Sequence, residues 1–99
     1  MRRAARTDAN LTEIVKALRQ AGCSVHITNG MWDITIGYGG LCMLGEVKDP
    51  RKPPSKRRRT AAQEQWLQTW TGGCRLILSV QDALEAANTL RAWSARLRA

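Results

Sequence analysis

Three residues near the middle of the chain have the types and the spacing that metal-assisted hydrolysis requires. Glu46 and Lys48 stand two positions apart in the stretch GYGGLCMLGEVKDP, and Asp33 lies thirteen residues before Glu46. Side chains two positions apart on a β-strand point to the same face of the sheet. Carboxylate oxygens are the ligands that magnesium and manganese prefer, and a nearby lysine can orient a nucleophile or offset charge in a transition state.

The dipeptide Gly39-Gly40 determines whether Asp33 meets Glu46. Two glycines accept the positive φ values of a tight hairpin turn, so the flanking segments are expected to pair as antiparallel strands. A two-residue turn sets Asp33 opposite Glu46, with Cβ atoms about 4.5 to 5.5 Å apart. Two carboxylates at that distance repel by roughly 3 kcal/mol at an effective dielectric constant near 20, and a divalent cation would relieve this repulsion. The backbone carbonyl of Val47 could add a further oxygen ligand.

Each charged residue taken alone has a simpler interpretation. A Glu-x-Lys sequence at a strand end is often a solvated ion pair, and Asp33 can merely begin a strand. However, the apolar residues Cys42 and Leu44 share the face of Glu46, which places the charged residues at the edge of a covered surface. We therefore interpret the three charged residues as one site.

The elements that must position this site follow the order α, β, β, β, α, β, α. Apolar spacing of three and four residues indicates helices, and alternation indicates strands. The expected helices cover 11–21, 61–71 and 81–98, and the expected strands cover 23–28, 33–37, 41–48 and 75–80, with a turn at Asn29-Gly30. A helix between the third and fourth strands allows them to be parallel, so we expect a mixed four-stranded sheet flanked by helices.

Two pairs of residues have the spacing of helix caps. Asn10 with Glu13 could cap the first helix, and Thr60 with Gln63 has the spacing of a capping box at the second.

The tryptophans and cysteines are expected to serve mainly in packing. Trp66 and Trp70 are four residues apart and are predicted to lie in the core, whereas Trp93 is predicted at the surface. No two cysteines form a CxxC pair, and each stands among apolar residues. We expect buried free thiols at Cys23, Cys42 and Cys74.

Charge gives the strongest indication of a partner. The length of 99 residues predicts a single domain, 1–99. The net charge of +8 predicts a polyanionic partner, and nucleic acid is favoured over a membrane surface. A proline-containing loop over 49–59 carries six cations suited to phosphate contacts, although such runs are also found as solvated surface or nuclear-import signals. These are Arg51, Lys52, Lys56, Arg57, Arg58 and Arg59. The sequence contains neither a signal peptide nor a run of about 20 apolar residues, so we expect a soluble, cytoplasmic protein.

Together, the motifs resemble a known family. Asp33 followed by Glu46-Val47-Lys48 is similar to the D…ExK core of the PD-(D/E)xK nuclease superfamily. The segments ARTDANLTEIVKALRQAG, WDITIGYGG, LGEVKD, PPSKRRRTAAQEQW and SVQDAL are similar, in this order, to small phage and prophage proteins of the VRR-NUC and Holliday-junction-resolvase-like group. The similarity runs from about Arg6 to Leu90.

The resemblance implies a restriction-endonuclease-like αβββαβα fold and a magnesium- or manganese-dependent endonuclease that acts on DNA, often as a homodimer. Asp33 and Glu46 are the implied metal ligands, and Lys48 is implied near the attacking water. Relatives often use an acidic residue of the first helix as a further ligand. Glu13 is the acidic residue inside that helix here, although it lies away from the apolar stripe.

Two other positions bear on the resemblance. Gln63 falls where relatives often carry a glutamine at the second helix, and a catalytic role and a capping role fit it equally well. The proline that usually precedes the aspartate is replaced by Trp32, which shifts the strand start or places an aromatic side chain at the DNA.

The predicted function is therefore a structure-selective DNA endonuclease of phage or prophage type. Four-way junctions, flaps, nicks and plain duplex are all open as substrates, as is the use of one or two metal ions. The alternatives are a non-catalytic basic DNA-binding module with a vestigial nuclease site, and an interaction protein whose charges only aid solubility. The clustered carboxylates favour the enzyme, because a protein that only binds polyanions gains nothing from them.

Overall fold

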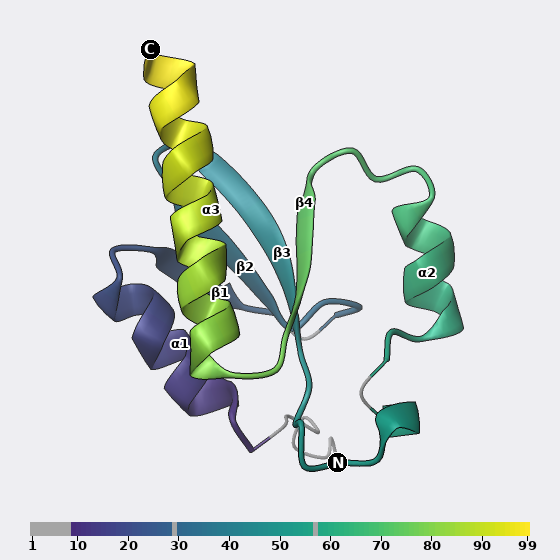
Figure 1. Ribbon diagram of the computed structural model, residues 1–99. Coiled ribbons are helices and arrows are strands. Elements are labelled where there is room, and N and C mark those ends of the chain that lie inside the picture. The colour runs from purple at the N-terminus through teal and green to yellow at the C-terminus, as the bar shows by residue number, and fades with distance from the viewer. Residues whose placement is uncertain (1–8, 29, 57) are drawn as a thin grey trace.

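Four strands form one mixed sheet, and two long helices pack on one of its faces (Figure 1). The computed structural model describes residues 9–28, 30–56 and 58–99. Its elements are α1 (Leu11–Gln20), β1 (Ser24–Ile27), β2 (Ile34–Tyr38), β3 (Leu41–Val47), the 3₁₀ turn η1 (Pro54–Lys56), α2 (Ala61–Leu67), β4 (Gly73–Ile77) and α3 (Val80–Arg98). The strands lie in the order β1-β2-β3-β4, and β3 and β4 are parallel. The predicted α/β class, element order and mixed sheet are confirmed.

The core lies between the sheet and the two helices α1 and α3. Its central side chains have no exposed surface: Ile14, Leu18, Ile34, Ile36 and Leu90. Because side chains alternate along a strand, the even-numbered residues of β3 face away from this core. Glu46 is one of these, so the charged residues lie on the face of the sheet opposite to α1 and α3.

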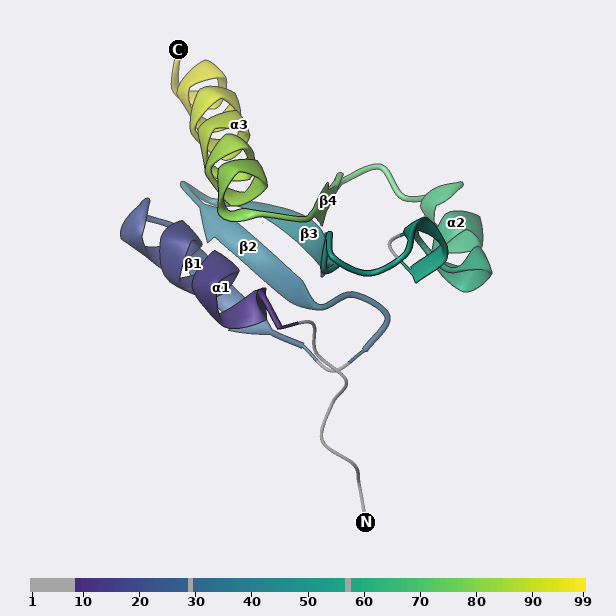
Figure 2. The same ribbon diagram turned by 60° about the horizontal axis from the view of Figure 1, so that its bottom comes forward.

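The short helix α2 stands apart from the other two helices, beyond β4 (Figure 1 and Figure 2). The segment before β2 reaches across to it, where Gln63 Nε2 donates a hydrogen bond of 2.7 Å to the carbonyl of Met31. Across the part of the chain that the structure describes, no helix is long and apolar enough to cross a membrane.

The hairpin of β2 and β3 has the predicted two-residue turn. Gly39 and Gly40 have φ values of 57° and 85°, in the left-handed region that glycine tolerates. The predicted register is confirmed along the ladder from Tyr38↔Leu41 to Ile34↔Gly45. The ladder ends there, one pair short of the predicted pair of Asp33 with Glu46.

The predicted end of the second helix is wrong. Helix α2 ends at Leu67, because the chain then tightens into hydrogen bonds between residues three apart, from Gln68 N to Gln65 O and from Trp70 N to Leu67 O. Trp70 therefore lies outside the helix. Strand β4 also begins two residues earlier than predicted, because Gly73 pairs with Met43 in the parallel ladder.

Two expectations about buried side chains are also wrong. Trp70 is 39% exposed and does not lie in the core, contrary to the prediction. Trp93 is 38% exposed, which agrees with its predicted place at the surface. Cys23 is buried, but Cys42 is exposed and Cys74 is half-buried. Cys42 and Cys74 lie on the face of the sheet that α1 and α3 leave uncovered, which explains their exposure.

Candidate functional site

Glu46 is a buried carboxylate near the end of β3. Its side chain is turned to the outer face of the sheet, yet the residue is only 5% exposed. Lys48 Nζ lies 2.9 Å from its Oε2 atom and forms an ion pair with it. Its Oε1 atom is buried and has no hydrogen-bond partner among the described residues. A buried carboxylate oxygen without a donor is costly, and a bound cation would satisfy it.

The surroundings of Glu46 raise its pKa above the ordinary value for a glutamate. The largest cause is burial, which disfavours the charged form, and the negative charge of Asp33 acts in the same direction. The hydrogen bond from Lys48 and the nearby amide of Gln63 oppose this shift and lower the pKa. The Asp33 carboxylate lies near Glu46, because its Oδ2 atom accepts a hydrogen bond of 2.8 Å from the backbone N–H of Val47, the residue that follows Glu46.

Asp33 lies just outside the regular ladder. Its backbone N–H donates to the carbonyl of Gly45 at 3.1 Å, and its Oδ2 atom accepts a hydrogen bond of 2.8 Å from the backbone N–H of Val47. The carboxylate thus replaces a backbone acceptor across the hairpin. This replacement holds Asp33 beside the strand that carries Glu46 and Lys48, although the three do not form the simple cross-strand pairing that was predicted.

Gln63 forms the predicted capping box and also reaches the site. Thr60 Oγ1 accepts from Gln63 N at 3.1 Å, and Gln63 Oε1 accepts from Thr60 N at 2.8 Å. The amide nitrogen donates to the carbonyl of Met31 at 2.7 Å, and a weaker hydrogen-bond interaction of the Gln63 side chain with the Glu46 carboxylate lowers the pKa of Glu46. Gln63 therefore anchors the start of α2 to the segment that precedes Asp33.

Asn10 does not cap α1 as expected. Its side chain makes no capping hydrogen bond, and its Nδ2 atom instead donates to the carbonyls of Lys48 at 3.1 Å and Leu78 at 3.0 Å. It thus joins the carboxyl-terminal ends of β3 and β4 and fixes the backbone of Lys48. Sequence analysis missed this role, because an asparagine before a helix is typical of a cap.

Glu13 is exposed on α1 and does not interact with Glu46. It lines a hollow of about 450 Å³ with Asp49 and Arg51. Hydrogen bonding to Asp49 is the main cause that raises the pKa of Arg51, and the charge of Glu13 makes a smaller contribution in the same direction. The Asp49 carboxylate accepts from Arg51 N and Nε at 2.9 and 3.0 Å and from Nη2 at 2.9 Å. Hydrogen bonds from Arg51 lower the pKa of Asp49. Arg51 is therefore exposed but paired.

The other predicted phosphate contacts differ in their placement. Lys52, Lys56 and Arg58 are exposed, whereas Arg57 lies outside the described residues. Arg59 is half-buried, and its Nε atom is buried without a partner among the described residues. Its charge and a side-chain hydrogen bond lower the pKa of Cys74, which burial raises more strongly. Arg59 thus packs beside β4 and is only partly accessible to DNA.

Trp32 does not present an aromatic surface to solvent. It is 7% exposed, and its ring centroid lies 5.6 Å from that of Trp66. Its burial corrects the expectation that it contacts DNA, and it instead packs α2 against the segment before Asp33.

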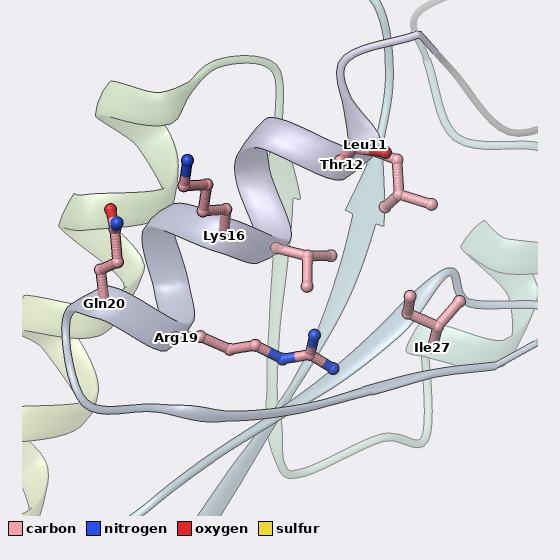
Figure 3. A pocket seen from close by; sticks show the side chains of 7 residues that line it. Leu11, Thr12, Lys16, Arg19, Gln20 and Ile27 are labelled. Carbon is pink, nitrogen blue, oxygen red and sulfur yellow. The ribbon is translucent and has the colours of Figure 1, made fainter.

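A hollow of about 460 Å³ opens elsewhere, between α1 and the end of β1 (Figure 3). Leu11, Val15 and Ile27 form its apolar part, and Lys16 and Arg19 are among its polar lining residues. None of the described residues that line it carries a carboxylate, and it lies on the side of the sheet that faces α1. It is therefore separate from Asp33 and Glu46.

Among the described residues, no three His, Cys, Asp or Glu side chains are grouped so that they could hold a metal ion by themselves. No protein-family model, curated protein or solved structure matches the chain. The geometry of Asp33, Glu46 and Lys48 is therefore the main indication of the function of the chain. Two carboxylates suffice for magnesium where water and substrate phosphates complete the coordination, because this ion keeps several waters in proteins. The donor set fits such an ion.

Proposed function

We propose that the chain is a magnesium- or manganese-dependent endonuclease that hydrolyses phosphodiester bonds in branched DNA. The observation that carries this proposal is the buried Oε1 atom of Glu46, which has no hydrogen-bond partner among the described residues and lies near a second carboxylate, Asp33. A solvated ion pair would leave the free oxygen of Glu46 in water. Its burial beside another anion supports a cation ligand.

Asp33 and Glu46 would hold the ion, with the carbonyl of Val47 as a further oxygen. When bound, the ion would polarise a phosphoryl oxygen and lower the pKa of a water molecule. Lys48 would orient the attacking water or offset negative charge on the phosphate in the transition state. Its ion pair with Glu46 holds the ammonium group at this position, and Asn10 holds its backbone.

The mixed four-stranded sheet with its helices is compatible with a restriction-endonuclease-like fold, which is part of this proposal. Asp33 directly precedes β2, Glu46 lies in β3, and Lys48 directly follows β3. Exposed cations in the loop that follows β3 would hold the DNA backbone: Arg51, Lys52, Lys56 and Arg58. A domain of this size offers one cutting centre, so cleavage of both strands at a symmetric junction would require a two-fold homodimer.

The experiment that tests the proposal is incubation of the purified chain with four-way junctions, flaps, nicked duplex and linear duplex. Each substrate is given with magnesium, with manganese or with EDTA. We expect cleavage of at least one branched substrate with either metal and none with EDTA. Tight binding of all substrates without cleavage under any metal would contradict the enzyme and favour the non-catalytic DNA-binding module.

A further inference from the structure

Three of the four tryptophans form a continuous row that begins next to Asp33. The ring centroids of Trp32 and Trp66 are 5.6 Å apart, and those of Trp66 and Trp70 are 4.7 Å apart with an interplanar angle of 30°. Exposure rises along the row, from buried Trp32 through half-buried Trp66 to Trp70, which is 39% exposed. The row thus connects the candidate site to an aromatic ring at the surface.

Trp70 is held in place although it lies outside a helix. Its indole Nε1 donates a hydrogen bond of 3.1 Å to the carbonyl of Gly73. At Gly72, a Cβ atom would lie 2.5 Å from Cζ2 of the same ring, so the ring needs a glycine there. Stacking on Trp66, the hydrogen bond and the glycine together fix the orientation of a ring that remains partly open to solvent.

We propose that Trp70 is a stacking platform for one unpaired nucleobase of the DNA. This inference rests on the proposed nuclease function and adds a substrate class to it, namely DNA with unpaired bases next to the cut. Fixed aromatic rings bind bases of any sequence, because every base presents a π face. Bases inside a duplex are already stacked on their neighbours and are not free to occupy such a ring.

The charge around the row selects a nucleic acid over an apolar protein partner. The exposed cations Lys56 and Arg58 lie in the segment that leads directly into α2, which carries Trp66. The whole chain has a net charge of +8. A phosphate backbone held by these cations would bring its bases towards α2, and Trp70 is the ring there that is most exposed.

Trp93 provides a matched control. It is 38% exposed, nearly the same as Trp70, but it belongs to α3 on the opposite face of the sheet. Its ring lies close to Gly73, whose carbonyl accepts the hydrogen bond from Trp70. Trp93→Ala therefore controls both for the loss of an exposed tryptophan and for altered packing at Gly73 while the Trp70 ring is kept.

The test measures binding without cleavage, so it does not depend on the catalytic proposal. A single-stranded oligonucleotide and a duplex of the same sequence are titrated in EDTA against the wild type, Trp70→Ala, Trp70→Phe and Trp93→Ala. We expect Trp70→Ala to weaken single-strand binding by roughly 5- to 150-fold, the effect of losing one stacked base. Duplex binding should be nearly unchanged, Trp70→Phe should retain most of the affinity, and Trp93→Ala should behave as the wild type.

A second measurement covers the case in which Trp70→Ala does not fold. Duplexes with a short single-stranded overhang, in which one abasic position is moved along the overhang and the duplex end fixes the register, are titrated against the wild type while its tryptophan fluorescence is recorded. A single position whose abasic form loses both affinity and quenching supports the platform. Equal affinity for every abasic position, or equal weakening of single-strand and duplex binding in Trp70→Ala, would overturn it. Failure of the wild type to cleave any DNA would reject the nuclease alone.

Discussion

The carboxylate of Asp33 accepts a hydrogen bond of 2.8 Å from the backbone N–H of Val47, the residue between Glu46 and Lys48. The Asp33 side chain, in the segment that leads into β2, thereby takes the place of a backbone carbonyl that would accept from β3 in a regular ladder. The hydrogen bond fixes one oxygen of Asp33 and leaves its charge beside Glu46. Mutations can therefore separate the effect of the hydrogen bond that positions Asp33 from the effect of its charge.

We predict that Asp33→Asn and Asp33→Ala differ in stability but not in cleavage. Asparagine keeps an oxygen that can accept from Val47 N, so Asp33→Asn should remain folded and bind DNA as tightly as the wild type or more tightly. Alanine loses the acceptor, which should cost about 1 to 3 kcal/mol of unfolding free energy. Denaturant titration and cleavage assays measure the two effects. Full cleavage by either variant would remove Asp33 from the metal site.

The raised pKa of Glu46 predicts how stability depends on pH in the metal-free protein. The folded state keeps the proton of Glu46 to a higher pH than the unfolded chain, in which the pKa of a glutamate is about 4.3. Between these two pKa values the folded state holds more protons, so the contribution of Glu46 to stability falls as pH rises. Below both pKa values Glu46 is neutral in the folded and the unfolded state, so it does not change the stability. Above both pKa values the loss of folding stability caused by Glu46 is complete.

Metal binding should reverse this dependence, because the ion requires the carboxylate form. We expect the rise in melting temperature on adding manganese to grow with pH across the same window, and Glu46→Gln to abolish the rise. The measurement is thermal unfolding from about pH 4 to about pH 8 with and without the metal. Glu85→Gln, which removes an exposed carboxylate on α3, serves as the control and should keep the wild-type response.

The two-residue turn predicts a strong effect of an insertion. One alanine after Gly40 should shift the register or force a bulge, and a one-residue slip turns side chains to the other face. We expect cleavage to fall far more than thermal stability, because apolar strands can readjust and a pair of ligands cannot. Circular dichroism and cleavage rates are compared with those of an alanine insertion after Leu97, at the exposed end of α3. A folded insertion variant with near-wild-type cleavage would reject the register argument.

Neighbouring arginines of the basic loop are predicted to act differently. Arg58 is exposed, so Arg58→Ala should lower the slope of log affinity against log salt by about 0.9 in magnitude, the value for one phosphate contact. Arg59 is half-buried beside Cys74, so Arg59→Ala should mainly reduce the free energy of unfolding. DNA titrations at several salt concentrations and denaturant unfolding give both quantities. Equal salt slopes for the wild type and Arg58→Ala would show that Arg58 is only solvated.

The hairpin could be predicted from sequence because two signals agreed. Gly39-Gly40 specifies a two-residue turn, and alternating apolar residues specify which face is buried. The last predicted pair, Asp33 with Glu46, does not form in the ladder, and no periodicity indicates that the Asp33 side chain will replace a backbone acceptor. The same limit applies to Asn10, whose amide binds two strand ends instead of its own helix.

The end of α2 could not be predicted because spacing alone is ambiguous. Trp66 and Trp70 are four residues apart, which fits a helix, but their rings also stack when the last turn tightens and the chain leaves the helix. Whether the helix continues or ends depends on Gly72, which makes room for the Trp70 ring. Such tertiary packing is not encoded in any local pattern.

The most direct test of the metal site is the cleavage rate of a four-way junction in manganese by the wild type, Glu46→Gln and Glu85→Gln. The account predicts cleavage by the wild type and by Glu85→Gln, and loss of all measurable cleavage in Glu46→Gln, which should still bind the junction. The amide retains the shape of the side chain and removes its charge, so a folding defect does not explain the loss. Cleavage by Glu46→Gln at the wild-type rate would contradict the assignment of Glu46 as a metal ligand.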